Sequence, residues 1–354
     1  MAVSQPLLEV EGLVKHFPGP SNLLQQSSVL VKAVDGVSFT VDEGTTFALV
    51  GESGCGKTTV AKNVLLLERP TDGVIRFRGK DINRLNRRDL KEYKHTVQAV
   101  FQDPYSSLNP RMQVKDIIGE PLRVHERMRG RRLQDRVAEL LNNVGLNPVT
   151  GSFFPHQFSG GQRQRIAIAR ALALQPKLIV LDEPVSGLDV SIRAQILNLL
   201  VDLQQEFGLS YLLISHDLAI VEHMSHRVGV MYVGKMVELA EKEDMYSDTV
   251  HPYTKALQHL SQVKEEAIAD GVITDAEKLR IAKAEAEVES LTPVLDAVQE
   301  ALASEAVEEP APPELAVEEP VVKEKPKARR TRKTTTKRVP TKRKYTRKKT
   351  EDKE

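Results

Sequence analysis

The sequence lacks three features that would place a protein outside the cytosol or inside a membrane. It has a single cysteine, Cys55, so an intrachain disulfide and a metal site built from several cysteines are both excluded. No apolar run approaches the roughly 20 residues that a helix needs to cross a bilayer. The N-terminus, MAVSQPLLEVEGL, lacks a basic stretch followed by a long apolar core, so we predict no signal peptide. We therefore expect a soluble, cytosolic protein.

The chain also has almost no net charge, +1 over 354 residues, but this balance conceals three unlike regions. Residues 1–264 contain 31 Lys and Arg against 29 Asp and Glu. Residues 265–322 contain 3 against 16, and residues 323–354 contain 16 against 4. Three compositions predict three regions, and the length suffices for one large domain plus additional segments. We place the main boundary near Ser261.

The segment GESGCGKTT fits the pattern G-x-x-x-x-G-K-[ST] of a phosphate-binding loop. It follows a fully apolar run, residues 47–50, which is typical of a buried parallel strand, and it precedes a predicted helix over 58–67. Backbone N–H groups and the helix N-terminus would surround the phosphates. Lys57 would reach the β- and γ-phosphates, and Thr58 would bind Mg²⁺. The predicted nucleotide-binding residues here are Gly51, Glu52, Ser53, Gly54, Cys55, Gly56, Lys57, Thr58 and Thr59.

Two further apolar runs end in polar residues that we expect beside this loop. Residues 178–181 precede Asp182 and Glu183, and residues 211–214 precede Ser215-His216. Ligands in open α/β sheets bind at the carboxyl ends of the strands. Asp182 therefore fits a Mg²⁺ ligand, and Glu183 would polarise the water that attacks the γ-phosphate. Spacing alone leaves His216 open between an ordinary surface or core histidine and a residue that orients the γ-phosphate.

The segment FSGGQRQR, residues 158–165, predicts a second anion-binding site. Ser159 suits a helix N-cap, and the paired glycines Gly160 and Gly161 allow close backbone approach before a predicted helix. One phosphate loop already surrounds one nucleotide, so a second site is useful only if it closes over a nucleotide held by another subunit. The sequence therefore predicts a dimer with composite ATP sites.

Together these motifs resemble the nucleotide-binding subunit of an ABC transporter, from residue 7 to about residue 260. Residues 51–58 match the Walker A motif, residues 178–183 match Walker B with its catalytic glutamate, and residues 158–162 match the signature motif, with Phe158 where Leu is commoner. The resemblance implies an ATPase that uses ATP and Mg²⁺. It also implies that Ser159, Gly160, Gly161 and Gln162 act in trans on the partner's nucleotide.

The same resemblance assigns roles to four residues outside these motifs. Gln102, in FQDP, matches the Q-loop glutamine and is implied to take part in catalysis and to bind Mg²⁺. His216 matches the switch histidine, and Asp189 belongs to a segment resembling the D-loop. Phe17 is the candidate for stacking on adenine; the alternative is a core aromatic, because the insert Pro18–Val31 separates it from the following strand.

The fold implied is α/β, namely a P-loop NTPase of ABC type. It has a β-rich N-terminal portion, a parallel core sheet flanked by helices, and a helical subdomain at about residues 103–158. Two stretches, residues 101–112 and 234–258, further resemble the ATPases of oligopeptide and dipeptide importers, and the insert after Phe17 fits their F-type subunit. The transported solute, whether a peptide, nickel or another, is left open.

Membership in that family implies several partners at the cytoplasmic face of the cell membrane, where this chain would be peripheral. They are two transmembrane permease subunits and a second ATPase subunit, either homologous or identical to this chain. An extracytoplasmic substrate-binding protein would act indirectly. The helical subdomain would dock on the permeases, and Gln102 would link it to the γ-phosphate.

Beyond Ser261 the resemblance ends. We expect a domain over 1–260, an acidic helical extension over 261–307, and a Pro/Glu linker with a basic, disordered tail over 308–354. The tail either lacks a dedicated partner, folds onto the acidic segment, or binds anionic lipid or nucleic acid. An alternative function is a soluble ABC ATPase that acts on ribosomes or nucleic acid through this tail. The single signature motif and the short segment 103–158 favour transport.

Overall fold

Two sheets organise the residues that the computed structural model describes, which are 5–18, 30–103, 107–247, 249, 251–269 and 277–291. The larger sheet has the order β10-β9-β3-β8-β7-β6. Its strands are β3 (Thr46–Val50), β6 (Val97–Val100), β7 (Leu178–Asp182), β8 (Ser210–Ser215), β9 (Arg227–Tyr232) and β10 (Lys235–Glu241). All neighbours are parallel except β10, which pairs antiparallel with β9.

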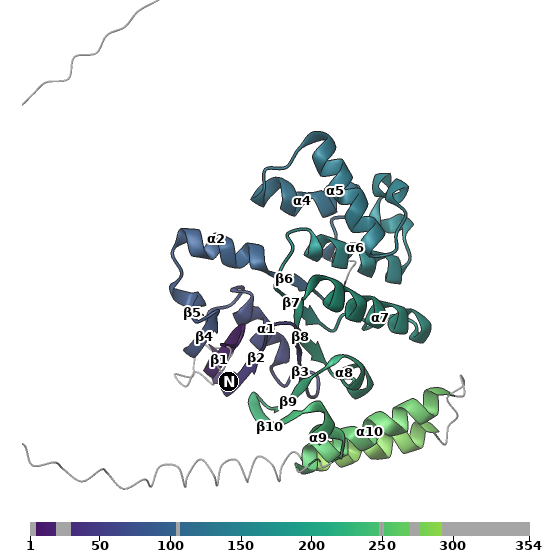
Figure 1. The fold of residues 1–354 in the computed structure, drawn as a ribbon. Helices are drawn as coiled ribbons and strands as arrows, with labels where there is room; N and C mark the ends of the chain where they lie inside the picture. Colours follow the sequence, from purple (N-terminus) through teal and green to yellow (C-terminus); the bar gives the residue numbers. More distant parts are fainter. Residues whose placement is uncertain are drawn as a thin grey trace, which may run out of the picture. The chain divides into compact units, whose positions relative to one another are not determined.

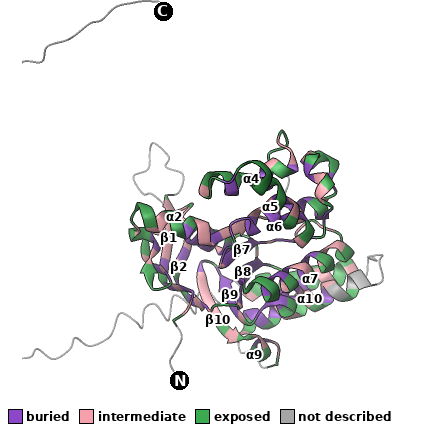
Figure 2. Ribbon diagram, turned by 45° about the horizontal axis from the view of Figure 1, so that its top comes forward, coloured by how far each residue is buried: buried purple, intermediate pink, exposed green. Residues whose placement is uncertain are grey.

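The three apolar runs of the sequence form the centre of this sheet. Every residue of β3, β7 and β8 is buried, and Figure 2 shows β7 and β8 in purple between the helices. A strand covered on both faces needs apolar side chains at every position, which is why these runs do not alternate. The parallel core sheet predicted from the sequence is therefore confirmed.

The smaller sheet is antiparallel and has the order β2-β1-β4-β5. Its strands are β1 (Leu8–Pro18), β2 (Leu30–Val41), β4 (Asp72–Phe77) and β5 (Lys80–Asp81). Phe39 of β2 stacks on Phe47 of β3 with ring centroids 4.6 Å apart, so the two sheets share one apolar cluster. The β-rich N-terminal portion predicted from the sequence is confirmed.

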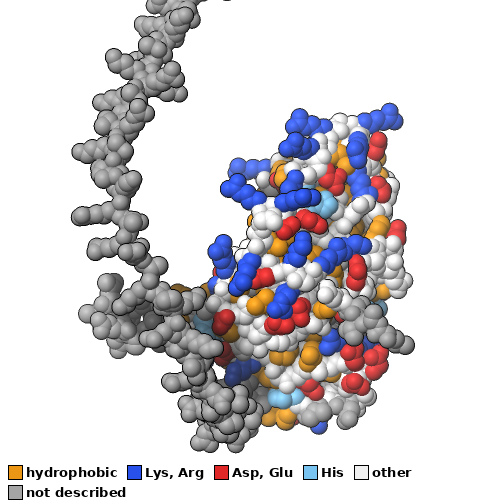
Figure 3. Space-filling model, turned by 60° about the vertical axis from the view of Figure 1, so that its left-hand side comes forward, with side chains coloured by type: hydrophobic (Ala, Val, Ile, Leu, Met, Phe, Trp, Pro, Cys, Tyr) orange, Lys and Arg blue, Asp and Glu red, His pale blue; other side chains and the backbone are white. Residues whose placement is uncertain are grey.

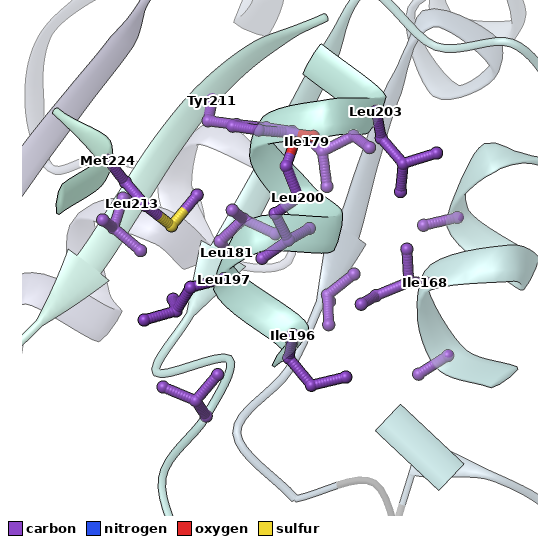
Figure 4. Close-up of a cluster of buried hydrophobic side chains, with 14 of the residues drawn as sticks. Ile168, Ile179, Leu181, Ile196, Leu197, Leu200, Leu203, Tyr211, Leu213 and Met224 are labelled. Atoms are coloured by element: carbon purple, nitrogen blue, oxygen red, sulfur yellow. Dashed lines mark hydrogen bonds between the residues drawn. The ribbon is translucent and has the colours of Figure 1, made fainter. Parts of the chain in front are cut away.

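Helices cover the core sheet and are anchored by apolar side chains. They are α1 (Lys57–Val64), α2 (Arg87–Thr96), α6 (Gly160–Leu172), α7 (Val190–Phe207) and α8 (Leu218–Met224), with a short 3₁₀ turn η1 (Ile82–Arg84). Figure 4 shows Leu200 of α7 beside Leu181 of β7, while Ile196 of α7 points toward the side of the cluster where Ile168 of α6 lies. Burying these aliphatic side chains fixes α6 and α7, and with them the loops at their N-termini.

The segment between β6 and α6 is helical, as predicted for residues 103–158. It contains α4 (Val114–His125), α5 (Gly130–Asn143) and the 3₁₀ turns η2 (Pro148–Ser152) and η3 (Pro155–Gln157). Figure 1 shows α4 and α5 side by side at one end of the core sheet. We call residues 107–158 the helical subdomain.

The described C-terminal part is also helical. It comprises α9 (Lys242–Ser247), α10 (Pro252–Ala269) and a further helix over residues 277–291. The boundary predicted near Ser261 lies within α10. The ion pairs His259–Glu287 and Arg280–Glu266 show that the last helix runs antiparallel to α10.

The helix over 277–291 is attached to the rest of the described chain by apolar packing. Ala284 and Val288 are 2% and 0% exposed, and Val288 belongs to the same apolar cluster as the core sheet. The predicted Pro/Glu linker and basic tail lie outside the described residues. None of the helices described is both long enough and apolar enough to span a bilayer.

Candidate functional site

The loop between β3 and α1 can be formed only with glycine at two positions. A Cβ added to Gly51 would lie 2.1 Å from the carbonyl oxygen of Met231, and one added to Gly56 would lie 2.1 Å from that of Ala33. Both glycines also have positive φ, +146° and +113°. The loop is therefore pressed against β9 and β2, and Ser53 and Gly54 remain exposed on its outer side.

Lys57 supplies the positive charge of this loop. It is 4% exposed, and its Nζ donates hydrogen bonds to the carbonyl oxygens of Gly51 at 2.7 Å and Glu52 at 2.6 Å. The N-terminus of α1 begins at the same residue. A buried ammonium and a helix N-terminus on one loop fit the phosphates of a nucleotide.

Thr58 and Asp182 form the candidate magnesium site. The Thr58 hydroxyl donates a 3.3 Å hydrogen bond to Oδ1 of Asp182 at the end of β7. Burial raises the pKa of Asp182, and the negative charge of Glu183 adds to this, while the Thr58 hydrogen bond opposes it. Hydroxyl and carboxylate oxygens are the donors that Mg²⁺ takes, commonly one or two from protein with the rest from phosphate and water. The residues present therefore fit the ion.

Glu183 lies between two polar side chains that reach it from different loops. Gln102 Nε2 donates to its Oε2 at 2.7 Å, and His216 Nδ1 lies 3.0 Å from its Oε1. The Glu183 backbone has φ +47°, the left-handed region that a residue with a side chain seldom adopts. Its N–H donates to the carbonyl of Ile214, so the strained conformation is fixed by β8.

The signature segment forms the N-terminus of α6. The Ser159 hydroxyl accepts from the N–H of Gln162 at 3.4 Å, and Oε1 of Gln162 accepts from the N–H of Ser159 at 3.0 Å, which is a capping box. A Cβ added to Gly161 would lie 2.4 Å from Cγ2 of Ile192, so α6 packs closely on α7 here. A surface hollow of about 650 Å³ lies over this helix end, and Asp189 and Gln102 also line it.

The predicted site residues thus fall into two groups. Gln102, Asp182, Glu183 and His216 gather with the loop 51–59 at the carboxyl ends of β3, β7 and β8. Within the described part of the chain, no hydrogen bond or ion pair joins residues 159–162 to that loop. The signature segment instead lines the hollow over the N-terminus of α6, and Gln102 lies on the border of this hollow.

Phe17 lies near the end of β1 and is half-buried. It pairs with Val31 of β2, two residues before Ala33, whose carbonyl lies against Gly56. Lys15 Nζ lies 4.8 Å from the Phe17 ring centroid. Phe17 therefore lies on the strand that pairs with β2, the strand that contacts the phosphate loop, and it is not a fully buried core residue. Its role in adenine stacking stays a prediction.

Two residues that were not predicted as site residues contact the site. Ser186 Oγ accepts from Gln102 Nε2 at 3.4 Å, and the phenol oxygen of Tyr253 accepts from the N–H of Glu52 at 3.2 Å. Tyr253 belongs to the HPYT segment, but nothing in its spacing indicates a contact with a loop some two hundred residues earlier. Only the fold brings the two together.

Three features together define a P-loop ATPase. They are a parallel sheet, a phosphate loop that requires glycine at positions 51 and 56, and the acidic pair Asp182-Glu183 at the end of β7. The family model described as ABC transporter matches residues 34–186. The oligopeptide transport ATP-binding protein AppF of Bacillus subtilis (strain 168) is 52% identical over 257 residues, which are 72% of this chain and 78% of AppF. OppF of the same organism is 50% identical over 258 residues, 72% of this chain and 82% of OppF. The chain therefore belongs to the ABC transporter family of ATP-binding proteins, and it binds and hydrolyses ATP.

Two further comparisons extend this result. The glutathione import ATP-binding protein GsiA of Escherichia coli (strain K12) is 51% identical over 253 residues, which are 72% of this chain but 41% of GsiA. The dimeric ATP-binding cassette MJ0796 bound to ADP and Pi superposes with a TM-score of 0.59 at 26% identity, covering 66% of this chain and 98% of MJ0796. That structure is a dimer in a post-hydrolysis state.

Proposed function

We propose that this chain is the ATP-hydrolysing subunit of a membrane importer, and that its solute is a peptide. The observation that supports the catalytic part is the Glu183 carboxylate, held by Gln102 on one oxygen and by His216 on the other. A carboxylate fixed on both sides is positioned to accept a proton from water, which makes the water a better nucleophile. Relatives named for oligopeptide transport and glutathione import support the solute class.

The chain's residues would divide the work on ATP as follows. The loop amides and Lys57 bind and orient the phosphates, and Glu183 orients the attacking water. Thr58 and Asp182 would hold Mg²⁺, with Gln102 as a further ligand. The ion, when bound, neutralises charge on the β- and γ-phosphate oxygens. His216, whose Nδ1 lies 3.0 Å from Oε1 of Glu183, would hold that carboxylate in place and contact the γ-phosphate.

The signature hollow would be completed by a second ATPase subunit. Ser159 is exposed at the N-terminus of α6, where free N–H groups and the helix dipole favour a phosphate. Because this helix end is not bonded to the chain's own phosphate loop among the described residues, the γ-phosphate it receives would be held by the partner. The partner is either a homologous chain or a second copy of this one.

The helical subdomain would dock on the permease subunits. A groove of about 680 Å³ runs between α4, α5 and η2, lined by apolar Leu133, Val137 and Leu141 and by charged Lys115 and Arg123. Figure 3 shows Lys and Arg side chains most densely at its top, the end where Figure 1 shows α4 and α5. An apolar groove with a charged border suits a short helix of a permease, and this chain would then be peripheral at the cytoplasmic face of the membrane.

Uptake measurements test the proposal. Cells lacking the gene should lose uptake of a labelled oligopeptide, and wild-type protein but not Glu183→Gln should restore it. If peptide uptake is unchanged while uptake of nickel or another solute stops, the proposed solute class is wrong. The chain would then still be the ATPase subunit of an importer. If no uptake changes and the protein sediments with ribosomes, the soluble alternative replaces transport.

The basic tail, residues 323–354, lies outside the described residues, and its binding to anionic lipid stays a prediction. The inner leaflet of a membrane is negative, and clustered Lys and Arg are attracted to it. The full chain should therefore bind anionic vesicles more tightly than a chain ending at Val322, and the difference should fall steeply with salt. Equal binding of vesicles by both chains would show that the tail does not bind lipid. Tighter binding of the full chain to duplex DNA or RNA than to vesicles would indicate that the tail's partner is nucleic acid.

A further inference from the structure

Two tyrosines of the C-terminal helices contact the backbone of the two loops that bear the catalytic site. Tyr253, in the first turn of α10, accepts a 3.2 Å hydrogen bond on its phenol oxygen from the N–H of Glu52. Tyr246, in α9, donates a 2.7 Å hydrogen bond from its hydroxyl to the carbonyl of Leu218. Leu218 begins α8, two residues after His216.

Tyr253 acts on the residue that holds the phosphate-binding lysine. The N–H of Glu52 bonds to Tyr253, and the carbonyl of the same Glu52 accepts from Lys57 Nζ at 2.6 Å. A shift of Glu52 therefore moves the acceptor that fixes the Lys57 ammonium. A second contact holds the loop from the same side, because the N–H of Gly234 donates to the carbonyl of Cys55 at 2.9 Å.

The Tyr253 ring has no freedom to move away from this position. It is 0% exposed, and its centroid lies 4.8 Å from that of Tyr232. It belongs to one apolar cluster with Ala256 of α10 and Val288 of the last helix. A side chain enclosed in this way presents its hydroxyl in one place, which is what a positioning residue requires.

Tyr246 acts in the same manner on the second loop. His216 Nδ1 reaches Glu183, and the chain then passes through Asp217, whose carboxylate caps α8 by accepting from the N–H of Ala219 at 3.1 Å. The Leu218 carbonyl held by Tyr246 fixes the start of that helix. The His216 loop is thus anchored at its far end by α9.

We propose that Tyr253 and Tyr246 are positioning residues of the ATPase, Tyr253 for ATP binding through Glu52 and Lys57, and Tyr246 for hydrolysis through the His216 loop. The proposal rests on the ATP hydrolysis assigned above. Catalytic geometry tolerates little displacement. Loss of the Tyr253 contact should therefore change ATP binding, and loss of the Tyr246 contact should change hydrolysis. The C-terminal helices are in this way part of the ATP site.

Tyrosine-to-phenylalanine variants of the full chain test this, because each removes one hydroxyl and keeps the ring. The matched control is Tyr211→Phe, since Tyr211 is buried and its hydroxyl donates to Leu200 of α7 at 2.8 Å, a contact with neither loop. Steady-state kcat and KM for ATP, the Kd of a fluorescent ATP analogue and the melting temperature are measured for all three.

Tyr253→Phe should raise KM and Kd roughly two- to tenfold, the value of one neutral hydrogen bond, with kcat changed less than about twofold. Tyr246→Phe should instead lower kcat roughly two- to tenfold with KM nearly unchanged. Tyr211→Phe should lower the melting temperature without either kinetic effect. If all three variants lower only the melting temperature, or the two loop variants change KM and kcat alike, the proposal is overturned. The Kd measurement needs no turnover, so it tests Tyr253 even if transport is not the chain's function.

Discussion

Gln102 donates a 2.7 Å hydrogen bond from Nε2 to Oε2 of Glu183, and so joins the segment after β6 to the carboxylate at the end of β7. β6 ends at Val100, and the chain then leaves the core sheet for the helical subdomain. A rotation of that subdomain relative to the sheet would displace Gln102 and, through this hydrogen bond, Glu183. Under the proposed function, hydrolysis would therefore depend on what the helical subdomain contacts.

Glu183→Gln should preserve ATP binding and stop turnover. The amide fills the same space but cannot accept a proton from water, so kcat should fall at least about a hundredfold. The analogue Kd should stay within about twofold, since no loop contact is removed. The control is Glu222→Gln, the same change at an exposed position of α8. Wild-type turnover in Glu183→Gln would remove Glu183 from the mechanism.

Ser159→Arg should separate binding from hydrolysis in another way. Ser159 is exposed and caps α6, and a bulky cation there blocks close approach of a partner's nucleotide to Gly160 and Gly161. ATP affinity at the chain's own phosphate loop should stay within about twofold, while turnover of the assembled dimer falls by more than about tenfold. Ser290→Arg, exposed on the last helix, is the control. Equal losses of affinity and turnover would place the signature segment at its own phosphate loop.

The core strands and the phosphate loop could be predicted because their signals are local. Residues 47–50 are all apolar, and the glycine pattern follows directly, so the strand, the turn and the helix are each read from neighbouring residues. The end of the helix predicted over 58–67 was less accurate: α1 stops at Val64, and Leu66 takes a left-handed conformation with φ +55°.

The contacts between distant segments could not be predicted from local patterns. Gln102 was identified only through resemblance to a family, because no periodicity links FQDP to Asp182-Glu183. Tyr253 and Tyr246 lie in the stretch 234–258 that resembles importer ATPases, but no pattern in it indicates a contact with the loops of the site, since a tyrosine in a helix is usually a core residue. Their hydroxyls acquire a role only when α9 and α10 fold onto the loops after β3 and β8.

Apolar packing, not charge, should hold the helix over 277–291 in place. Val288 is fully buried, and Val288→Ala removes two carbon atoms from the core, which should lower the free energy of unfolding by about 1.5 kcal/mol. The neighbouring Glu287 forms a 3.0 Å ion pair with His259, but both side chains are about half exposed. Glu287→Gln should therefore cost less than about 0.5 kcal/mol. Urea midpoints at constant m-value measure both, and a larger loss for Glu287→Gln would contradict this assignment.

Asp182→Asn should stabilise the nucleotide-free protein at neutral pH while abolishing magnesium-dependent hydrolysis. Burial raises the pKa of Asp182 above its value in the unfolded chain, so the folded state binds the proton more tightly. The cost of ionising Asp182 is therefore absent below the unfolded pKa. This cost appears as the pH rises from the pKa of Asp182 in the unfolded chain to its pKa in the folded protein. Above the folded-state pKa the full cost remains.

Asparagine has no charge to bury and can still accept from Thr58, so the variant avoids this cost. The difference in melting temperature between Asp182→Asn and wild type should be near zero at the most acidic pH where both fold. It should then grow to a plateau above the folded pKa. Asp202→Asn, at an exposed position of α7, is the control for the loss of one carboxylate. A difference that shrinks with rising pH would mean that Asp182 is stabilised as a carboxylate in the folded protein.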